Sequence, residues 1–305
     1  MSAITTAAEG AGGTLDELAV WEAFRALRLE GRTVHERLSD YIVGSGVLER
    51  CGDTLEIGVG DAHLWRTGGQ PLLDAVLARG ELVLTDQDAD LVQRCASYPL
   101  LQREGVTTRR ADARELPFAD RCFARVMTTH VLHWCGSPDG VRAAVGELAR
   151  VLAVDGRALV TTVDERVHMG EVYSLLSRAA AAIEAAGVPV TEPIPSSSPR
   201  VAPFCAGNAE DFLRERFDVV ERVDCDYAHI VEPWHAQLDV PGEVFMVRYL
   251  RTLPFVKEAL RSGRMRPELL EEVRVSLADH LARDGSFRMS RRDVIYDCRQ
   301  PRDLG

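Results

Sequence analysis

The stretch "TLEIGVGDA", residues 54–62, decides the fold of this chain. A short apolar run leads into Gly58 and Gly60, and a helix-like segment follows, as in a turn that brings backbone close to a nucleotide. An NAD-type fingerprint needs a third glycine three residues after the second, where this sequence has His63. The turn therefore favours a ligand without a pyrophosphate, and the acid at Glu56 favours a cationic one. Two glycines alone are equally compatible with an ordinary tight turn, so other segments must decide.

Composition and charge indicate a globular protein. The 305 residues allow one large α/β domain with additions or two small domains, and 46% of them are hydrophobic. A net charge of -11 disfavours nucleic acid and anionic membranes as partners, and no apolar run is long enough to span a bilayer. The first 14 residues resemble no secretory signal, and the seven scattered cysteines lack a CxxC pair. These features predict a cytoplasmic protein with reduced thiols.

The scarcity of lysine argues against two classes of chemistry. Lys257 is the only lysine in the chain, and it lies in an amphipathic, helix-like stretch late in the sequence. A P-loop requires a lysine directly after its glycines, and Schiff-base enzymes require a lysine nucleophile. We therefore expect neither P-loop phosphate chemistry nor pyridoxal chemistry.

Strand-like and helix-like segments alternate between residues 51 and 165. Strands are expected at 54–59, 81–86, 106–113, 123–134 (running into a helix) and 157–164, and helices at 71–78, 89–99 and 137–156, the last ended by Gly156. This alternation predicts a parallel sheet with helices on both faces, whose strands end on the edge where ligands bind. With later strands at 218–231 and 286–299, the predicted fold class is α/β, a doubly wound, mostly parallel, seven-stranded sheet.

The rest of the chain is predicted to form additions to this sheet. A flexible tail is expected at residues 1–14, followed by N-terminal helices at 15–50. The core is expected in two parts, 51–232 and 284–300, which are separated by a helical insertion at 233–283. Within the core, the Pro/Ser-rich stretch 189–203 is expected to be a loop.

Polar residues follow three more predicted strands, on the same edge as the glycine turn. Asp86 ends the second strand, where a carboxylate accepts both hydroxyls of a ribose. Asp112 ends the third strand, where a carboxylate accepts an exocyclic amine. Thr128, Thr129 and His130 end the fourth strand. This ordered set favours a nucleoside-containing ligand over an ordinary tight turn.

The ordered set resembles the class I S-adenosylmethionine-dependent methyltransferases, and within them the type 11, ubiquinone-biosynthesis-like branch that acts on small molecules. The matching stretches are "LEIGVGDA", "ELVLTDQDADLVQRC", "RADARELPFADRCFARVMTTHVLHW" and "ELARVLAVDGRALVTT", within residues 50–165. The implied cofactor is a sulfonium without a phosphate, so the third glycine is dispensable and an acid is useful. The sequence departs from the family at Ala62, where the motif usually has its last glycine.

The resemblance implies a role for each matching residue. Glu56, Gly58 and Gly60 would hold the methionine part of the cofactor, with the glycine backbone beneath the sugar. The other implied contacts are Asp86 to the ribose, Gln87 beside the adenine, Asp112 and the Ala113 amide at the adenine edge, and Thr128 at the methionine part.

Two histidines are the candidate catalytic residues. Methyl transfer is an in-line displacement in which alignment of donor and acceptor supplies about 7–11 kcal/mol of the barrier. A base is needed only if the acceptor carries a proton that must leave, and a histidine base contributes about 10²–10⁴-fold. His130 and His133 lie just past the fourth strand, facing the reaction edge. Local packing of either ring is the alternative.

The acceptor is predicted to bind outside the sheet. The candidate substrate contacts are Trp21, Phe24, Tyr41, His229, Trp234, Phe245 and Tyr249. One helix buries only one apolar stripe, so the aromatic residues left over in the insertion are expected to form a lid over a partly apolar acceptor. Ordinary core packing and a homo-oligomer interface made by the N-terminal or insertion helices are the alternatives. His229, His235 and Gln237 match no strong metal motif, so no metal is expected.

The prediction is an S-adenosylmethionine-dependent methyltransferase that acts on a small, partly apolar metabolite of secondary metabolism and releases S-adenosylhomocysteine. The acceptor atom, whether carbon, nitrogen or oxygen, stays open. Two alternatives remain. One is a methyltransferase fold that binds the cofactor without turnover and acts as a regulatory module, and the other is an NAD-dependent oxidoreductase, which His63 disfavours.

Overall fold

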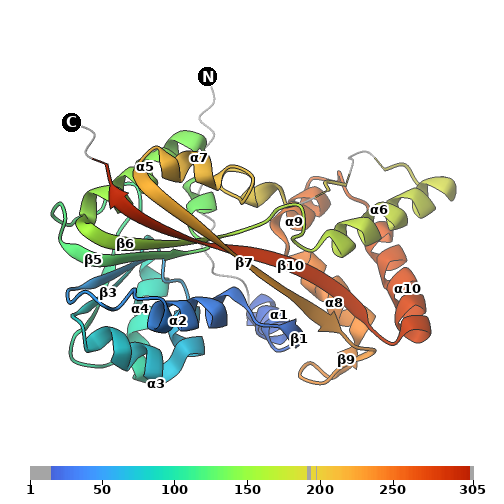
Figure 1. Cartoon of the computed structure of the whole chain (residues 1–305). Helices are drawn as coiled ribbons and strands as arrows, with labels where there is room; N and C mark the ends of the chain where they lie inside the picture. Colours follow the sequence, from blue (N-terminus) through green and yellow to red (C-terminus); the bar gives the residue numbers. More distant parts are fainter. Residues whose placement is uncertain (1–14, 191–193, 197, 303–305) are drawn as a thin grey trace. The chain divides into compact units, whose positions relative to one another are not determined.

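The computed structural model describes residues 15–190, 194–196 and 198–302, and the main sheet of this part has eight strands. Their order is β1-β7-β10-β6-β5-β2-β3-β4 (Figure 1). In chain order they are β1 (Arg28–Gly31), β2 (Thr54–Ile57), β3 (Leu82–Asp86), β4 (Val106–Arg110), β5 (Phe123–Thr129), β6 (Leu152–Val163), β7 (Phe217–Val231) and β10 (Phe287–Pro301). The strands β2 to β6 pair in parallel, and β10 runs antiparallel to β6. The predicted doubly wound, mostly parallel α/β sheet is confirmed.

The helices and short elements follow the strands along the chain. The α-helices are α1 (Leu15–Arg25), α2 (Val34–Gly44), α3 (His63–Leu77), α4 (Ala89–Ser97), α5 (Pro138–Val151), α6 (Gly170–Ala185), α7 (Ala209–Arg214), α8 (Gly242–Thr252), α9 (Pro254–Arg261) and α10 (Pro267–Asp284). Three short 3₁₀ turns and a two-stranded ribbon complete the described part: η1 (Pro99–Leu101), η2 (Leu132–Cys135), η3 (Pro199–Val201), β8 (Trp234–His235) and β9 (Val240–Pro241). Within the described residues, no helix combines the length and apolar character needed to cross a bilayer.

The chain divides into two compact units. The larger, which we call the sheet unit, comprises residues 29–178, 193–230 and 288–305. The smaller, the helical unit, comprises residues 1–28, 179–192 and 231–287. Every predicted cofactor contact and both candidate catalytic histidines fall in the sheet unit.

Alternate side chains of the central strands enter two separate hydrophobic layers of the sheet unit. Leu55 and Ile57 of β2 pack in a layer with α5 and α7, whereas Leu84 of β3 and Met127 of β5 pack in a layer with α2, α3 and α4. This period of two is expected for strands that are covered on both faces. Glu56, between Leu55 and Ile57, therefore faces the second layer.

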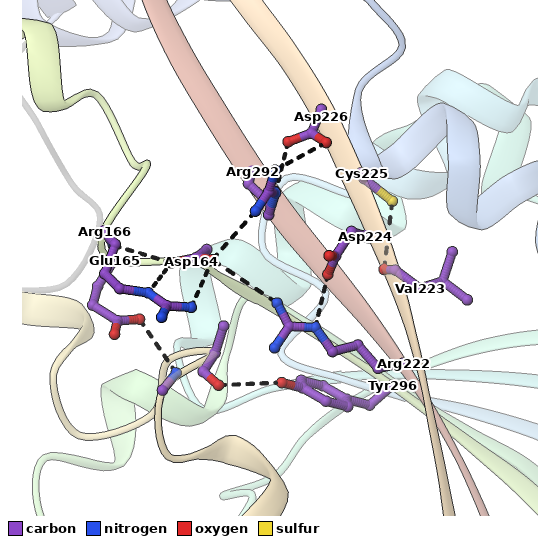
Figure 2. A network of polar contacts seen from close by, with 12 residues as sticks. Asp164, Glu165, Arg166, Arg222, Val223, Asp224, Cys225, Asp226, Arg292 and Tyr296 are labelled. Atoms are coloured by element: carbon purple, nitrogen blue, oxygen red, sulfur yellow. Dashed lines mark hydrogen bonds and ion pairs between the residues drawn. The ribbon is translucent and has the colours of Figure 1, made fainter.

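An ion-pair network ties the end of β6 to β7 and β10 (Figure 2). Asp164 directly follows β6 and is buried. Its carboxylate lies 3.9 Å from Arg222 of β7 and 4.0 Å from Arg292 of β10. These two arginines also pair with Asp224 and Asp226, respectively, both at 2.7 Å. Because a buried carboxylate is costly without partners, the network favours one arrangement of the three strands at this edge.

Two elements differ from the sequence prediction. The helix expected at 137–156 ends at Val151, and Gly156 lies inside β6. There the pairing of β5 with β6 shifts register, and a Cβ on Gly156 would lie 2.9 Å from the Ala124 carbonyl oxygen. The second difference is β1, which lies in a region expected to be helical and adds an eighth strand beside β7. Its four residues are mostly exposed, so the strand is formed by backbone pairing at the sheet edge. Its sequence has no alternation of apolar and polar residues that would predict a strand.

Candidate active site

The two glycines of the turn after β2 serve different purposes. Both have positive φ, +71° at Gly58 and +54° at Gly60, which is a conformation that favours glycine. A Cβ at Gly58 would lie 2.4 Å from Val131 Cγ2, so this glycine is required by packing. A Cβ at Gly60 would meet no atom within 4 Å. Open space beside Gly60 leaves its backbone accessible to a ligand.

Ala62 keeps the backbone conformation of the glycine that it replaces. Its φ is 58° and its ψ is 34°, in the left-handed region, at the residue that precedes α3. This conformation costs a residue with a Cβ about 1–2 kcal/mol. The methyl group is buried, so the turn has the expected shape at the expense of local strain.

Glu56 is a buried carboxylate surrounded by neutral donors. Its side chain accepts hydrogen bonds from Trp65 Nε1 and, at 3.3 Å, from Thr129 Oγ1. Burial, with a smaller contribution from Asp86, raises the pKa of Glu56 to about 7, although the two hydrogen bonds oppose the shift. No described cationic side chain pairs with it. The sequence prediction identified Glu56 and placed Thr129 at a strand end on the same edge, but it did not predict that Trp65 and Thr129 donate to Glu56.

Asp86 closes the turn from the neighbouring strand. Its Oδ2 accepts from the Gly60 backbone N–H at 2.9 Å, and its Oδ1 accepts from the Asp88 N–H at 3.0 Å. Each oxygen keeps a further lone pair, which is what a ribose diol needs. The next residue, Gln87, is exposed, and its carbonyl accepts from Arg110 Nε at 2.9 Å.

Asp112 already has a partner in the structure. Arg114 Nη2 lies 2.6 Å from Asp112 Oδ2, and the Arg114 N–H donates to Oδ1 at 2.9 Å. These bonds hold the pKa of Asp112 below its usual value. Ala113 between them is buried. A role for Asp112 and Ala113 at the adenine edge stays a prediction.

The side chain of Thr128 in β5 lies on the opposite face of the sheet from the side chain of Glu56 in β2. Its neighbour Met127 packs in the same layer as Glu56, so the alternation of the strand turns Thr128 away from it. The buried Thr128 hydroxyl has no hydrogen-bond partner among the residues that the structure describes. Thr129, whose side chain points to the other face of the sheet from that of Thr128, donates a hydrogen bond to Glu56. The contact of Thr128 with the methionine part of a cofactor stays a prediction, as do the other assigned cofactor roles.

His130 stands at the carboxyl end of β5 in a constrained backbone conformation. Its φ is +57°, and its N–H donates to the Thr161 side-chain oxygen at 3.1 Å. Positive φ in a residue other than glycine clusters at functional sites. Nε2 of the ring lies 3.6 Å from Asp293 Oδ2 and has no hydrogen-bond partner. Burial lowers the pKa of His130, while Asp293 opposes this, so a neutral imidazole is present near pH 7.

More imidazoles surround His130. The rings of His35 and His63 are 4.3 Å apart, and those of His35 and His130 are 6.0 Å apart. The predicted catalytic residue His133 lies in η2, where burial lowers its pKa to about 3 and leaves Nδ1 without a partner. Such a low pKa makes His133 the weaker base of the two candidates. Among the described residues, no group of three or more His, Cys, Asp or Glu is arranged to hold a metal ion.

The predicted substrate contacts lie in both units. Within the helical unit, Phe24 stacks on Tyr249 at 4.3 Å between ring centroids, and Trp21 packs edge-on against both. Phe245 is buried beside these rings and stacks on His235 at 4.2 Å. These aromatic side chains build the interior of the helical unit. Their contact with an acceptor stays a prediction.

The other three predicted substrate contacts have separate surroundings. Trp234, in β8 of the helical unit, is half exposed. In the sheet unit, the Tyr41 hydroxyl donates to Asp297 at 2.8 Å. The His229 ring lies edge-on to Tyr227 at 5.6 Å, on β7. His229 and His235 belong to different units.

Comparison with known families identifies the segment that carries this site. The family model described as a methyltransferase domain matches residues 55–160, which run from β2 into β6. Residues 55–160 are a methyltransferase domain. The match confirms the predicted enzyme class, an S-adenosylmethionine-dependent methyltransferase, and its cofactor. Among curated proteins, none matches this chain.

Solved structures similar to this chain share little sequence with it. The YcgJ protein of Bacillus subtilis is 17% identical, with a TM-score of 0.45 over 85% of this chain and 98% of that one. Phosphoethanolamine N-methyltransferase 2 of Haemonchus contortus is 12% identical, with a TM-score of 0.48 over 93% and 58%. The N-methyltransferase NodS of Bradyrhizobium japonicum is 16% identical, with a TM-score of 0.41 over 63% and 76%.

The residues of the methyltransferase domain fit its cofactor. The space beside Gly60 admits a group against backbone. Glu56 is a buried acid without a cationic partner among the described residues, and Asp86 has acceptor capacity left. S-Adenosylmethionine carries the matching groups, namely an ammonium, a sulfonium and a ribose diol.

Proposed function

We propose that this protein transfers a methyl group from S-adenosylmethionine to a small, partly apolar metabolite of secondary metabolism. Glu56 carries the proposal, because a carboxyl group buried among neutral donors suits a ligand that brings its own positive charge. When bound, the cofactor supplies an electrophilic methyl group. Gly60 and Asp86 hold and orient it, while His130, a neutral imidazole at the same sheet edge, accepts a proton from the acceptor.

The segment that follows His130 supports the class of acceptor. Trp134 follows in η2 with 51% of its surface exposed, and its ring lies 5.4 Å from the His133 ring. An exposed indole four residues after the proposed base supports an acceptor that is partly apolar. The net charge of -11 supports a small molecule over nucleic acid or a membrane surface as the partner. A cytoplasmic location and a homo-oligomer through the N-terminal or insertion helices remain part of the proposal.

Calorimetry separates the proposal from its alternatives. S-Adenosylhomocysteine is expected to bind, and NADH is not. Binding of NADH without heat from S-adenosylhomocysteine would contradict the proposal and favour an oxidoreductase. Release of S-adenosylhomocysteine in the presence of a panel of phenols, carboxylic acids and amines then tests turnover. Tight cofactor binding with no acceptor in the broadest panel would favour a regulatory module.

A further inference from the structure

We propose that Asp293 is a positioning residue for His130, which orients the imidazole ring and stabilises the imidazolium formed when the acceptor loses its proton. The inference rests on the proposed function and names a residue outside the methyltransferase domain match. It is carried by the geometry of β10 at the carboxyl edge of the sheet.

Asp293 reaches this edge because β10 runs in the opposite direction to its neighbour. In the antiparallel register, Asp293 pairs with Val163, the last residue of β6. The early part of β10 therefore lies where the parallel strands end. Thr161 of β6, two residues earlier, is also the residue whose side chain accepts the His130 N–H. Strand register thus brings a residue far away in sequence beside the predicted base.

The Asp293 carboxylate is fully buried and held from two sides. Its Oδ2 accepts from the Tyr227 hydroxyl at 2.6 Å, and its Oδ1 lies 3.3 Å from Arg291 Nη2. Burial alone raises the pKa of Asp293, but Arg291, His130 and Tyr227 outweigh burial and lower it to about 2. The carboxylate is therefore ionised throughout the range in which an enzyme works.

The His130 ring presents an unsatisfied nitrogen to this carboxylate. Nε2 is buried without a hydrogen-bond partner and lies 3.6 Å from Asp293 Oδ2. This distance is too long for a hydrogen bond to the neutral ring, but catalytic contacts commonly tighten in the reacting complex.

Within the part of the chain that the structure describes, the other titratable and charged groups around His130 do not supply an anion. They come from α2, the start of α3, η2, the segment before α6, β7 and β10, and they are His35, His63, His133, His168, His229, Tyr227 and Arg291. Each is neutral or cationic near pH 7. Asp293 is thus the negative charge that acts on His130.

The step balances with the groups named. The bond between the acceptor atom and its proton breaks, and the proton moves to the His130 imidazole. The acceptor atom forms a bond to the methyl carbon, whose bond to the sulfonium breaks and leaves neutral S-adenosylhomocysteine. The positive charge has moved from sulfur to His130, beside the Asp293 carboxylate. Solvent then removes the proton from the imidazolium.

The alternative is that Asp293 only neutralises the charge of Arg291, in which case the pKa of His130 does not depend on it. Nuclear magnetic resonance distinguishes the two roles. Histidine labelled with ¹⁵N and ¹³C reports the pKa of His130 and shows which ring nitrogen carries the proton, with the signal assigned from a His130→Asn variant. Asp293→Asn is expected to lower the pKa of His130 by about one pH unit or more. It should also reduce the population that carries the proton on Nε2. Asp293→Glu keeps the charge and should retain most of the wild-type pKa.

Asp297→Asn is the matched control. Asp297 is buried on the same face of the same strand, but it pairs with Arg157 and Tyr41. This variant should leave the pKa of His130 unchanged. If Asp293→Asn does not fold, Tyr227→Phe replaces it. That variant removes a donor that disperses the carboxylate charge, so it should raise the pKa of His130. An unchanged pKa and tautomer in whichever of the two variants folds overturns the inference.

The outcome is distinguishable from failure of the proposed function. The resonance measurement needs no acceptor, and failure of wild-type protein to bind S-adenosylhomocysteine counts against the proposed function alone. With a turned-over acceptor, Asp293→Asn should lower kcat about 10²-fold, with KM unchanged and the acid limb of the pH profile moved to lower pH. Wild-type kcat and an unmoved limb in this variant would refute the role of Asp293 while the methyltransferase assignment stands.

Discussion

Two buried carboxylates of the sheet unit have opposite properties. Glu56 at the end of β2 is 2% exposed, and burial raises its pKa to about 7. Asp293 in β10 is fully buried, yet its pKa lies near 2. The cost of burying a charge is common to both. Their neighbours differ, because Glu56 has an indole N–H and a hydroxyl, whereas Asp293 has Arg291, Tyr227 and His130.

The difference assigns the two regions to different tasks. Asp293 already has a cationic partner, Arg291, so it needs no ligand to become ionised and is proposed to act on His130. Among the described residues Glu56 has no cationic partner, and an incoming ammonium or sulfonium is proposed to complete its surroundings. In the proposed mechanism, one region prepares the base and the other receives the cofactor. The predictions below test this division.

Loss of the base is expected to have the largest effect. His130→Asn should reduce turnover about 10²–10⁴-fold, because a general base acts in the transition state. The affinity for S-adenosylhomocysteine should stay unchanged, since the ring belongs to the Asp293 region. Rates and calorimetry on the same variant check both statements, with His280→Asn in α10 as the control. Equal loss of turnover and cofactor affinity would show that the Asp293 region also contributes to cofactor binding, which contradicts the division.

Glu56→Gln should change how stability depends on pH. A raised pKa in the folded protein gives stability that is fully present below the unfolded value of 4.5 and is lost as pH rises through about 7. The free energy of unfolding of the wild type should therefore fall, relative to the variant, by about 2 kcal/mol between pH 5.5 and pH 8. Urea denaturation at both pH values measures this. Histidine titrations are common to both proteins and cancel, and a constant difference would show that Glu56 is ionised throughout.

Asp86→Ala should weaken cofactor binding by about 1–3 kcal/mol, because two ribose hydroxyls lose an acceptor and the Gly60 N–H loses its partner. Titration with S-adenosylhomocysteine measures the change. Asp90→Ala in the first turn of α4, on an exposed side chain, is the control and should bind as the wild type does. Unchanged affinity in Asp86→Ala would remove Asp86 from the cofactor site.

Ala62→Gly should produce the smallest effect, a gain of about 1 kcal/mol in the free energy of unfolding. Glycine adopts the left-handed conformation of this residue without the steric cost of a Cβ, although greater freedom of the unfolded chain offsets part of the gain. Urea denaturation of the two proteins at one pH gives the difference. A lower stability of the variant would mean that packing of the buried methyl group outweighs the strain.

Residues that act through local geometry were predictable from the sequence, and those that act through pairing across the sheet were not. The turn at Gly58 and Gly60 and the strand end at Asp86 follow from short patterns, and the structure places Asp86 against the turn. Trp65 beside Glu56 and Asp293 beside His130 depend on which face a side chain takes and on the direction of β10. Neither leaves a local signal.

The aromatic residues of the insertion illustrate the same limit. Phe245 and Tyr249 stand out in the sequence because they are large and apolar, which serves a lid and a core equally well. In the structure they pack with Phe24 and His235 inside the helical unit. The amino-acid composition indicated that these side chains are buried. The residues against which they pack could be identified only from the fold.

Proton release on cofactor binding tests the central claim most directly. At pH 6 a carboxyl group with a pKa near 7 is mostly protonated, and an ammonium placed against it drives the proton off. Titration of S-adenosylhomocysteine into the wild type, in buffers of different ionisation enthalpy, should therefore show release of about 0.9 proton per cofactor. Glu56→Gln should show none. Binding of the cofactor to the wild type without proton release would contradict the assignment of Glu56 as the group that receives its charge.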